Sequence, residues 1–546
     1  MDKCQDETRG YRSPPSLRSL ASQFELIQTW TRRANGRGWT SCEKVASDPT
    51  EPDSSEGIRY TTAGKQTVVR LMWCIRALVL NMLSTPLLAG GVALVYIIGT
   101  YVYAWSRLRH IKGPLLGSFS YAFILRTELA FRQGDSWANV IKKYGDPVRI
   151  GPNDLLTGDA NVIRRINGVR STYERSDFYE TPLMDPNHPN LFAITDTKAH
   201  DELKAKMSHG YGGREVPQLE RDIDEQVQKL VDLLRSKYAQ RGNLADFAWL
   251  SLYFALDVIT SIAYGKSFGY LQQEKDIHGH IVGAKAFIKV ATITSEIPWM
   301  GRFLRSKTVM NLLGPKATDK RGVGVLFGLT LKCCTKGSFI RHGVSQRECE
   351  SEIPFQIMAG SDTTARAFRG TLLYLMSAPQ AYSTLQKEID AAINAGRISQ
   401  PATAQQCRDL PYLQACIYEG LRLTVPTTIL LTKKAPPEGD TIGPHSIPGG
   451  TRISVAIKAI MQDTSLFGRD ANIYRPERWI GLESAQRRSM LSTVELVFGY
   501  GRFGCSGKPV ALMELNKVFT EVGPLLVWRF DEISSDPRND ARHDCR

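Results

Sequence analysis

The sequence predicts a mainly α-helical fold with a smaller β region, preceded by a single transmembrane helix. Long amphipathic stretches run through residues 217–240, 243–265, 348–377 and 378–394, and apolar side chains recurring at helical spacing indicate helices with one buried face. The strand-like pieces are short by comparison. A separate run of thirty residues, 77–106, carries no formal charge. We therefore expect a large helical domain that follows a membrane anchor.

The uncharged run is long enough to cross a bilayer. Its most apolar part extends from Leu87 to Trp105, and about 20 apolar residues suffice for a helix to span the hydrocarbon core. Tyr101, Tyr103 and Trp105 cluster at one end, as aromatic side chains do at membrane interfaces. A buried core helix is the other interpretation. It fits less well, because apolar residues surround the whole helix rather than forming one stripe.

The chain divides into three parts by composition. Residues 1–76 are polar and irregular, which predicts a disordered leader. The anchor follows over 77–106, and 107–546 has the composition of a globular domain. Shorter strand-like pieces, at 145–150 and 451–456, predict the β region of that domain.

The charge balance limits the kinds of partner. Lysine and arginine exceed aspartate and glutamate, which gives a formal net charge of +14. Such an excess suits nucleic acid, an anionic membrane or an acidic protein. No basic run interleaved with aromatic residues and no zinc-finger spacing occurs, so we do not expect nucleic-acid binding. Ten cysteines in 546 residues do not form a disulfide scaffold.

A glycine-rich loop near the C-terminus is the strongest candidate for chemistry. In the stretch from Leu496 to Phe519, an apolar, strand-like piece meets the loop, and a helix is expected to begin near Lys508-Pro509. Cys505 precedes that helix, whose free N–H groups favour a thiolate over a thiol. The loop contains four glycines, Gly499, Gly501, Gly504 and Gly507. Glycine lets the backbone approach a large flat ligand closely. This pattern fits an iron–sulfur bond from Cys505, although an inert buried cysteine remains the alternative.

The same loop also has the outline of a dinucleotide-binding turn. Gly499–Gly504 reads G-x-G-x-x-G, and Glu521 lies 17 residues past the last glycine. This interpretation would make the chain a nicotinamide or flavin enzyme. Only 25 residues follow Glu521 in the sequence, fewer than the rest of a doubly wound sheet needs. It also gives Cys505 no role.

A second constellation, Met358–Ala365, interrupts a strong helical pattern with one glycine and two threonines. These residues weaken the hydrogen-bond ladder of a helix, which can open a groove for a small ligand and water. Asp362 and Thr363 could then pass protons to bound dioxygen. A kinked core helix with capped hydroxyls is the other interpretation.

Two further motifs carry charged pairs. Glu419 and Arg422 lie three residues apart on a predicted helix, so their side chains share a face. The stretch Tyr474–Trp479 supplies Arg478 on a proline-fixed loop. A surface salt bridge is the usual fate of an isolated pair of this kind.

Together and in this order, the four motifs resemble those of the cytochrome P450 family, over roughly residues 107–530. AGSDTT is similar to the oxygen-side helix motif, EGLR to the Glu-x-x-Arg pair and PERW to the loop that completes that triad. The resemblance implies that Cys505 is the axial ligand of haem iron and that Asp362 and Thr363 relay protons. It also implies a lock around the haem formed by Glu419, Arg422 and Arg478.

The cysteine loop follows the family pattern Phe-x-x-Gly-x-Arg-x-Cys-x-Gly with one departure. Phe498 and Gly501 match, so the resemblance implies that they contact the cofactor, but Phe503 occupies the arginine position. The segment His200-Asp-Glu-Leu-Lys204 is similar to the helix that binds the haem propionates, with histidine and lysine where tryptophan and arginine are commoner. The other interpretation of His200 and Lys204 is a solvated helix face.

The resemblance implies a monooxygenase that inserts one atom of dioxygen into a small apolar organic substrate. It further implies haem b with an axial thiolate, O2 as co-substrate, and NADPH electrons from a separate flavoprotein reductase, with cytochrome b5 as a second donor. We expect a single-pass protein of the endoplasmic reticulum with its haem domain in the cytosol. The sequence is most similar to fungal pisatin-demethylase-type members, which act in secondary metabolism or detoxification. A haem-binding protein with altered termini and impaired turnover is the alternative.

Overall fold

The computed structural model describes Trp73, Leu88 and residues 90–92, 94–130, 132–180, 188–211, 218–333 and 338–523. Contacts divide the chain into residues 1–91 and 92–546, and the fold that follows is that of the second unit. The leader expected over 1–76 lies outside the described residues, apart from Trp73. The boundaries expected for the three parts of the chain therefore stay predictions.

One mixed sheet forms the main β region. Its strands, in spatial order, are β1 (Val148–Gly151), β2 (Asp154–Thr157), β7 (Arg452–Val455), β4 (Lys433–Lys434) and β3 (Glu174–Arg175). Strand β7 runs parallel to β2, and the other neighbours pair antiparallel. A separate hairpin joins β5 (Asp440–Ile442) to β6 (His445–Ile447). Strands were predicted near 145–150 and 451–456, and β1 and β7 confirm both.

Helices make up most of the domain, as the amphipathic stretches predict. Those of the N-terminal half are α3 (Leu115–Phe119), α4 (Ala122–Leu129), α5 (Gln133–Tyr144), α6 (Ala160–Asn167), α7 (Thr197–Tyr211), α8 (Leu219–Leu233), α9 (Phe247–Tyr264), α10 (Tyr270–Gln273), α11 (His280–Glu296), α12 (Pro298–Leu304), α13 (Lys307–Leu313) and α14 (Gly324–Cys333). Those of the C-terminal half are α15 (Ser338–Arg341), α16 (Gln346–Met376), α17 (Pro379–Asn394), α18 (Ala404–Arg408), α19 (Pro411–Thr424), α20 (Ile457–Met461), α21 (Thr464–Phe467), α22 (Ser484–Val494) and α23 (Lys508–Val522). Short 3-10 helices include η1 (Asp177–Glu180), η4 (Pro476–Trp479), η5 (Glu495–Phe498) and η6 (Gly501–Phe503).

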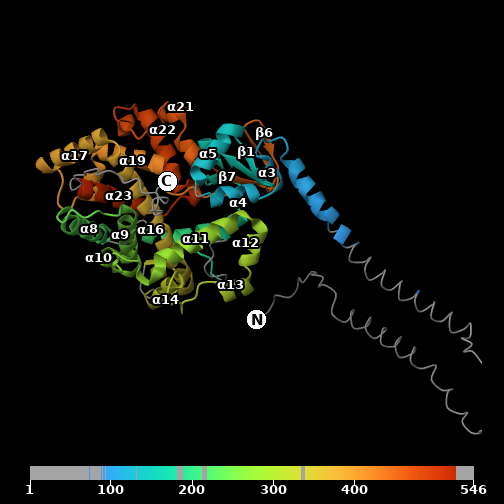
Figure 1. The fold of residues 1–546 in the computed structure, drawn as a ribbon, viewed down its shortest axis with the longest axis horizontal. Coiled ribbons are helices and arrows are strands. Elements are labelled where there is room, and N and C mark those ends of the chain that lie inside the picture. Colours follow the sequence, from blue (N-terminus) through green and yellow to red (C-terminus); the bar gives the residue numbers. More distant parts are fainter. Residues whose placement is uncertain are drawn as a thin grey trace, which may run out of the picture. The chain divides into compact units, whose positions relative to one another are not determined.

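The central helix α16 packs along α9, and α9 in turn packs against α8 (Figure 1). Its start follows from the sequence, because Ser345 and Glu348 form a reciprocal capping box. Helix α9 begins after Asp246, whose carboxylate accepts the N–H groups of Ala248 and Trp249. A Cβ at Gly360 would meet the Ile259 side chain at 3.3 Å, so the glycine lets α16 lie close to α9.

Within the described residues, α9 alone is long and apolar enough to cross a membrane. Most of it is buried in the core, where it packs against α8 and α16, so its apolar character is explained by the fold. The anchor predicted over 77–106 falls partly outside the described residues. From residue 94 onward it is helical, and large apolar side chains are exposed there, with Tyr96 at 72%. A membrane-spanning role stays a prediction.

Candidate functional site

The cysteine loop lies between a 3-10 helix and the start of α23. The backbone N–H of Cys505 donates to the Phe498 carbonyl at 2.7 Å, which closes the loop. The apolar run before the loop is the 3-10 helix η5, so the strand predicted there was wrong. The dinucleotide interpretation needed that strand. Gly501 has a φ of +60°, and an added Cβ would lie 2.3 Å from the Asn167 carbonyl oxygen, so only glycine fits.

The Cys505 thiol is exposed to solvent at the bottom of this loop. Its sulfur accepts hydrogen bonds from the backbone N–H groups of Gly507 and Lys508, which lower the thiol pKa, as do the charges of Lys204 and Lys508. Desolvation by the surrounding chain is the largest effect, and the net pKa is raised. The N–H groups at the helix N-terminus thus favour the thiolate, as expected, but burial outweighs them in the free thiol. A bound metal ion would supply the missing positive charge.

Helix α7 places Lys204 directly on the cysteine loop. Its Nζ donates to the carbonyl oxygens of Arg502 at 2.7 Å and Gly504 at 2.8 Å. One turn earlier on α7, His200 is buried and its ring centroid lies 4.8 Å from that of Phe503. Desolvation, with the nearby Arg175 charge, lowers the pKa of His200 to about 4, so its imidazole is neutral at pH 7. The two side chains face the loop and do not form a solvated helix surface.

Two cations that the sequence did not single out lie beside Phe503. Arg175 and Lys433 are directly opposite each other on the antiparallel strands β3 and β4. The Lys433 Nζ lies 3.1 Å from the Phe503 ring centroid, and the Arg175 guanidinium carbon lies 4.6 Å from it. The Arg175 Nη1 also donates to three backbone carbonyls, those of Leu191, Phe192 and Ile194.

Within the part of the chain that the structure describes, no carboxylate forms an ion pair with either of these two cations, although Asp201 acts on Arg175 electrostatically. The Lys433 Nζ is buried and has no hydrogen-bond partner among the described residues. Desolvation, with the Arg175 and Arg502 charges, lowers the pKa of Lys433 to about 6. Like charges directly opposite on a sheet are destabilising, and a buried charge without a partner is rare. A ligand with carboxylate groups beside Cys505 fits this arrangement, as the two acid groups of haem would. No sequence signal could reveal the pair, because only the pairing of β3 with β4 creates it.

Asp362 and Thr363 lie mid-way along α16, which continues unbroken through the AGSDTT motif. The Thr363 Oγ1 donates to the Ala359 carbonyl at 2.7 Å, within its own helix. Asp362 lies one turn from Arg366, whose charge it stabilises. In the part of the chain that the structure describes, no hydrogen bond or ion pair joins these two residues to the cysteine loop. Their role stays a prediction.

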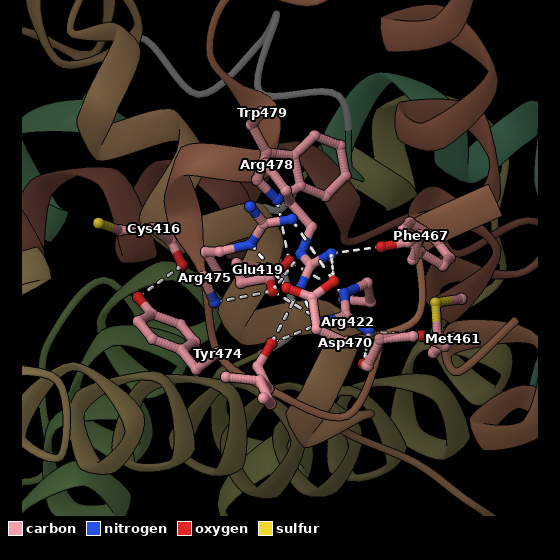
Figure 2. Close-up of polar contacts among 12 residues, drawn as sticks. Cys416, Glu419, Arg422, Met461, Phe467, Asp470, Tyr474, Arg475, Arg478 and Trp479 are labelled. Atoms are coloured by element: carbon pink, nitrogen blue, oxygen red, sulfur yellow. Dashed lines mark hydrogen bonds and ion pairs between the residues drawn. The ribbon is translucent and has the colours of Figure 1, made fainter. Parts of the chain in front are cut away.

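Glu419 is the centre of a buried charge cluster (Figure 2). Its Oε1 accepts from Arg422 Nη2 at 2.7 Å and from Arg478 Nε at 2.8 Å, and its Oε2 accepts from Trp479 Nε1 at 3.0 Å. Neither Glu419 nor Arg422 has exposed side-chain surface. Other guanidinium N–H groups of the two arginines donate to backbone carbonyls, among them those of Met461 and Phe467. The pair is thus a buried lock between α19 and η4, not a surface salt bridge.

A mainly helical domain with a small mixed sheet, an open cysteine at a helix N-terminus and an unmatched cation pair beside it together match the class of haem-thiolate proteins. The family profile described as Cytochrome P450 matches residues 334–538. The chain is 44% identical over 479 residues to "Cytochrome P450 monooxygenase ABA1" of Pyricularia oryzae, covering 83% of this chain and 93% of the relative. It is 39% identical over 434 residues to "Cytochrome P450 monooxygenase aba1" of Botryotinia fuckeliana, covering 76% and 85%.

A third relative, "Cytochrome P450 monooxygenase abl1" of Leptosphaeria maculans, is 36% identical over 439 residues, with 77% of each chain covered. The chain belongs to the cytochrome P450 family and is a monooxygenase, an oxidoreductase that acts with molecular oxygen. Membership implies a thiolate-ligated haem and electrons from a reductase. The narrower likeness to pisatin-demethylase-type members stays a prediction.

Proposed function

We propose that this chain binds haem b through the thiolate of Cys505 and inserts one oxygen atom from O2 into a small apolar organic substrate. Bound there, the haem would supply oxygen activation, which a thiolate ligand promotes by pushing electron density toward iron. The observation that carries the proposal is the exposed Cys505 sulfur, held by two backbone N–H groups at the start of α23. Gly501 and Phe498 shape the loop so that a flat ligand can lie against it.

The acid groups of the haem would be held by cations beside the cysteine loop. Lys433 and Arg175 would be the principal partners, because both are buried beside Phe503 and neither forms an ion pair within the described ranges. His200 borders the same space as a neutral hydrogen-bonding ring. Lys204 fixes the loop through two backbone carbonyls. Phe503 replaces the arginine of the family pattern, and the positive charge comes instead from the strands.

Asp362 and Thr363 would hold and pass on the protons that oxygen activation requires. Thr363 would do so through Oγ1, which must first leave the Ala359 carbonyl. Asp362 would return a proton from solvent to that hydroxyl, since its carboxylate is only partly buried. General acid catalysis by a positioned side chain is worth roughly 10²–10⁴-fold, so this pair would decide how efficiently electrons lead to product.

Electrons would come from a membrane-bound, NADPH-dependent flavoprotein reductase, with cytochrome b5 as a second donor. The anchor over 77–106 would place the domain of 107–546 at the cytosolic face of the endoplasmic reticulum, after a leader over 1–76. Two hydrogen bonds from Arg149 hold the end of the exposed apolar helix against the sheet, through the carbonyls of Ala104 and Trp105. The +14 net charge suits an acidic docking surface.

The relatives come from fungi, which supports a role in fungal secondary metabolism or detoxification. The decisive experiment compares the ferrous carbonyl spectra of wild type and Cys505→Ala. We expect the thiolate-type Soret band in wild type and its loss in the variant. A variant that keeps the band would exclude Cys505 as the ligand. Turnover with added reductase then separates an active monooxygenase from a haem-binding protein without turnover.

A further inference from the structure

A second charge cluster is buried between the sheet and the helices that cover it, and it uses no residue of the cysteine site. Asp154 and Arg452 are paired across β2 and β7, with Asp154 Oδ1 at 3.2 Å from Arg452 Nε. Glu296, the last residue of α11, approaches Arg452 Nη2 at 3.8 Å, and Asp177 of η1 approaches Nε at 3.9 Å. Asp154 and Glu296 are each 1% exposed, and Arg452 is 5% exposed.

Most polar atoms of this cluster have no hydrogen bond. Both carboxylate oxygens of Asp154, both of Glu296 and all three guanidinium nitrogens of Arg452 lack a partner with hydrogen-bond geometry among the described residues. Buried polar atoms are almost always satisfied. Their concentration at one place shows that hydrogen bonds within the described residues do not neutralise the charges of this cluster.

The charges do not balance either. Among the described residues, Arg452 is the only cation that lies within ion-pair distance of Asp154, Asp177 and Glu296. A fourth, Glu128 of α4, acts on Glu296 electrostatically and has its own Oε1 unpartnered. Desolvation raises the pKa of Glu128 to about 7, although Gln133 donates to its Oε2 at 2.9 Å. Desolvation likewise raises the pKa values of Asp154 and Glu296.

The surrounding elements add little compensation. The Tyr121 phenol, just before α4, faces Asp154 and has a raised pKa, chiefly through desolvation. Arg149 of β1 acts on Asp154 but uses its nitrogens on backbone carbonyls. Arg305, after α12, pairs with Glu180 at 2.9 Å and donates to the Asp177 carbonyl. The groups on the elements packed against the cluster therefore do not neutralise its excess of negative charge.

A metal ion does not fit this site. No group of three or more histidine, cysteine, aspartate or glutamate side chains is arranged to hold one anywhere in the described ranges. Protons are the remaining small cations, and carboxyl groups with raised pKa values bind them near neutrality.

We propose that the cluster of Asp154, Arg452, Glu296, Asp177 and Glu128 is a proton-binding site that holds α11 and η1 onto the sheet. A protonated Glu296 or Glu128 donates to a neighbouring carboxylate, and Arg452 neutralises one more. Loss of the protons leaves buried carboxylates facing each other, and their repulsion loosens α11 and η1 from β2 and β7.

The direction of the pH effect follows from the raised pKa values. A carboxyl group whose pKa is raised in the folded state stabilises that state fully below its unfolded pKa and loses the contribution as pH rises through the folded value. Attachment of α11 and η1 to the sheet is therefore strongest below the ordinary carboxyl pKa and weakens as pH rises to about 7, the value for Glu128. Helix η1 also carries Tyr179, whose ring lies 4.6 Å from the Arg175 guanidinium carbon, so the attachment reaches the cation pair beside Cys505.

Hydrogen–deuterium exchange of the full chain, corrected for intrinsic rates, tests this between about pH 5 and about pH 9. We expect protection of residues 280–305 in wild type to fall about tenfold or more as pH rises, since one unit of pKa displacement is a factor of ten. Glu296→Gln and Glu128→Gln keep the shape but remove a titrating carboxyl, and at least one should flatten the profile. The control Glu225→Gln removes a surface carboxylate paired with Lys229 and should leave it unchanged.

Infrared spectra give a second, independent readout. The wild type at neutral pH should show the carbonyl stretch of a protonated carboxylic acid, and the flattened variant should lose part of it. The proposal is overturned if protection of 280–305 does not change with pH, if both glutamine variants keep the wild-type profile, or if the neutral-pH spectrum lacks that band.

Discussion

The ammonium group of Lys204 donates to the carbonyl oxygen of Gly504 at 2.8 Å, one residue before Cys505. Because it also donates to the Arg502 carbonyl at 2.7 Å, it fixes two of the peptide groups of the loop before Cys505. Lys204→Met should lower the free energy of unfolding by about 1–2 kcal/mol, since the ammonium is partly exposed, and should reduce the haem content of the purified protein. Thermal unfolding and the haem-to-protein ratio measure both effects.

The exposed Lys206, on the same helix, provides the control. Lys206→Met should leave haem content unchanged, whereas Lys204→Arg should restore part of it. Equal haem content in Lys204→Met and wild type would show that the loop does not depend on this contact.

Removing the Lys433 ammonium should have opposite effects on the apoprotein and on haem binding. Burial lowers the pKa of Lys433 to about 6, so the unfolded chain binds this proton more strongly than the folded chain. Stability of the haem-free protein should therefore rise with pH above about 6, and Lys433→Met should abolish that rise. The variant should be more stable without haem and should bind haem more weakly. Urea unfolding across pH and haem titration are the measurements, with the exposed neighbour Lys434→Met as control.

Thr363→Ala should keep haem and substrate binding but divert electrons to hydrogen peroxide. Without the Oγ1, proton delivery loses a contribution of roughly 10²–10⁴-fold, while the helix is preserved. The ratio of product formed to NADPH consumed measures the effect. Thr384→Ala removes a hydroxyl that makes the same kind of bond, to the Gln380 carbonyl at 2.9 Å, and should not alter the ratio. Asp362→Asn must be measured separately, because members of one relay are not additive. Wild-type coupling in Thr363→Ala would remove this residue from the mechanism.

Glu419→Gln should destabilise the domain strongly. Arg422 would lose its carboxylate while staying buried, Arg478 would keep only its pairing with Asp470 at 3.2 Å, and breaking a buried ion pair typically costs about 3–5 kcal/mol. Chemical denaturation of the holoprotein gives the value. A loss no larger than that of the surface variant Glu225→Gln would mean that Asp470 and the backbone carbonyls suffice for the two arginines.

Purified protein alone should not consume NADPH for turnover. Added reductase should restore activity, and rising salt should weaken it, because surface charges are screened over about 8 Å at physiological ionic strength. The initial rate as a function of ionic strength is the measurement. Turnover without any partner would contradict the proposed electron supply and revive a nucleotide role for the loop from Gly499 to Gly504.

The helical body could be predicted because its signals are local. Helix α16 follows from its capping box and apolar face, and α23 begins at Lys508 as its proline indicates. The strand predicted before Gly499 was wrong, since a short apolar stretch fits a strand and a 3-10 helix equally well. The EGLR and PERW motifs correctly brought Glu419, Arg422 and Arg478 together, whereas the relation of this cluster to the haem stays a prediction.

Arg175 and Lys433 could not be predicted, and the reason is physical. Each lies in a strand of two residues, which is too short to show any periodicity. The two cations meet only because strands far apart in the sequence pair with each other. The cluster around Arg452 could not be predicted for the same reason, because its members come from two strands, two helices and η1. Buried charge is a tertiary property, whereas sequence patterns report local ones.

The Glu419 lock also sets an order of assembly during synthesis. Its bond to Arg422 spans three residues and can form as soon as α19 does, but its bond to Arg478 spans 59. Until Arg478 leaves the ribosome, the carboxylate lacks Arg478 and Trp479, and the entropy of closing the longer loop must still be overcome. A nascent chain halted before Arg478 should thus be held by its first pair alone, an unfinished state that chaperones and proteases can distinguish from the completed domain.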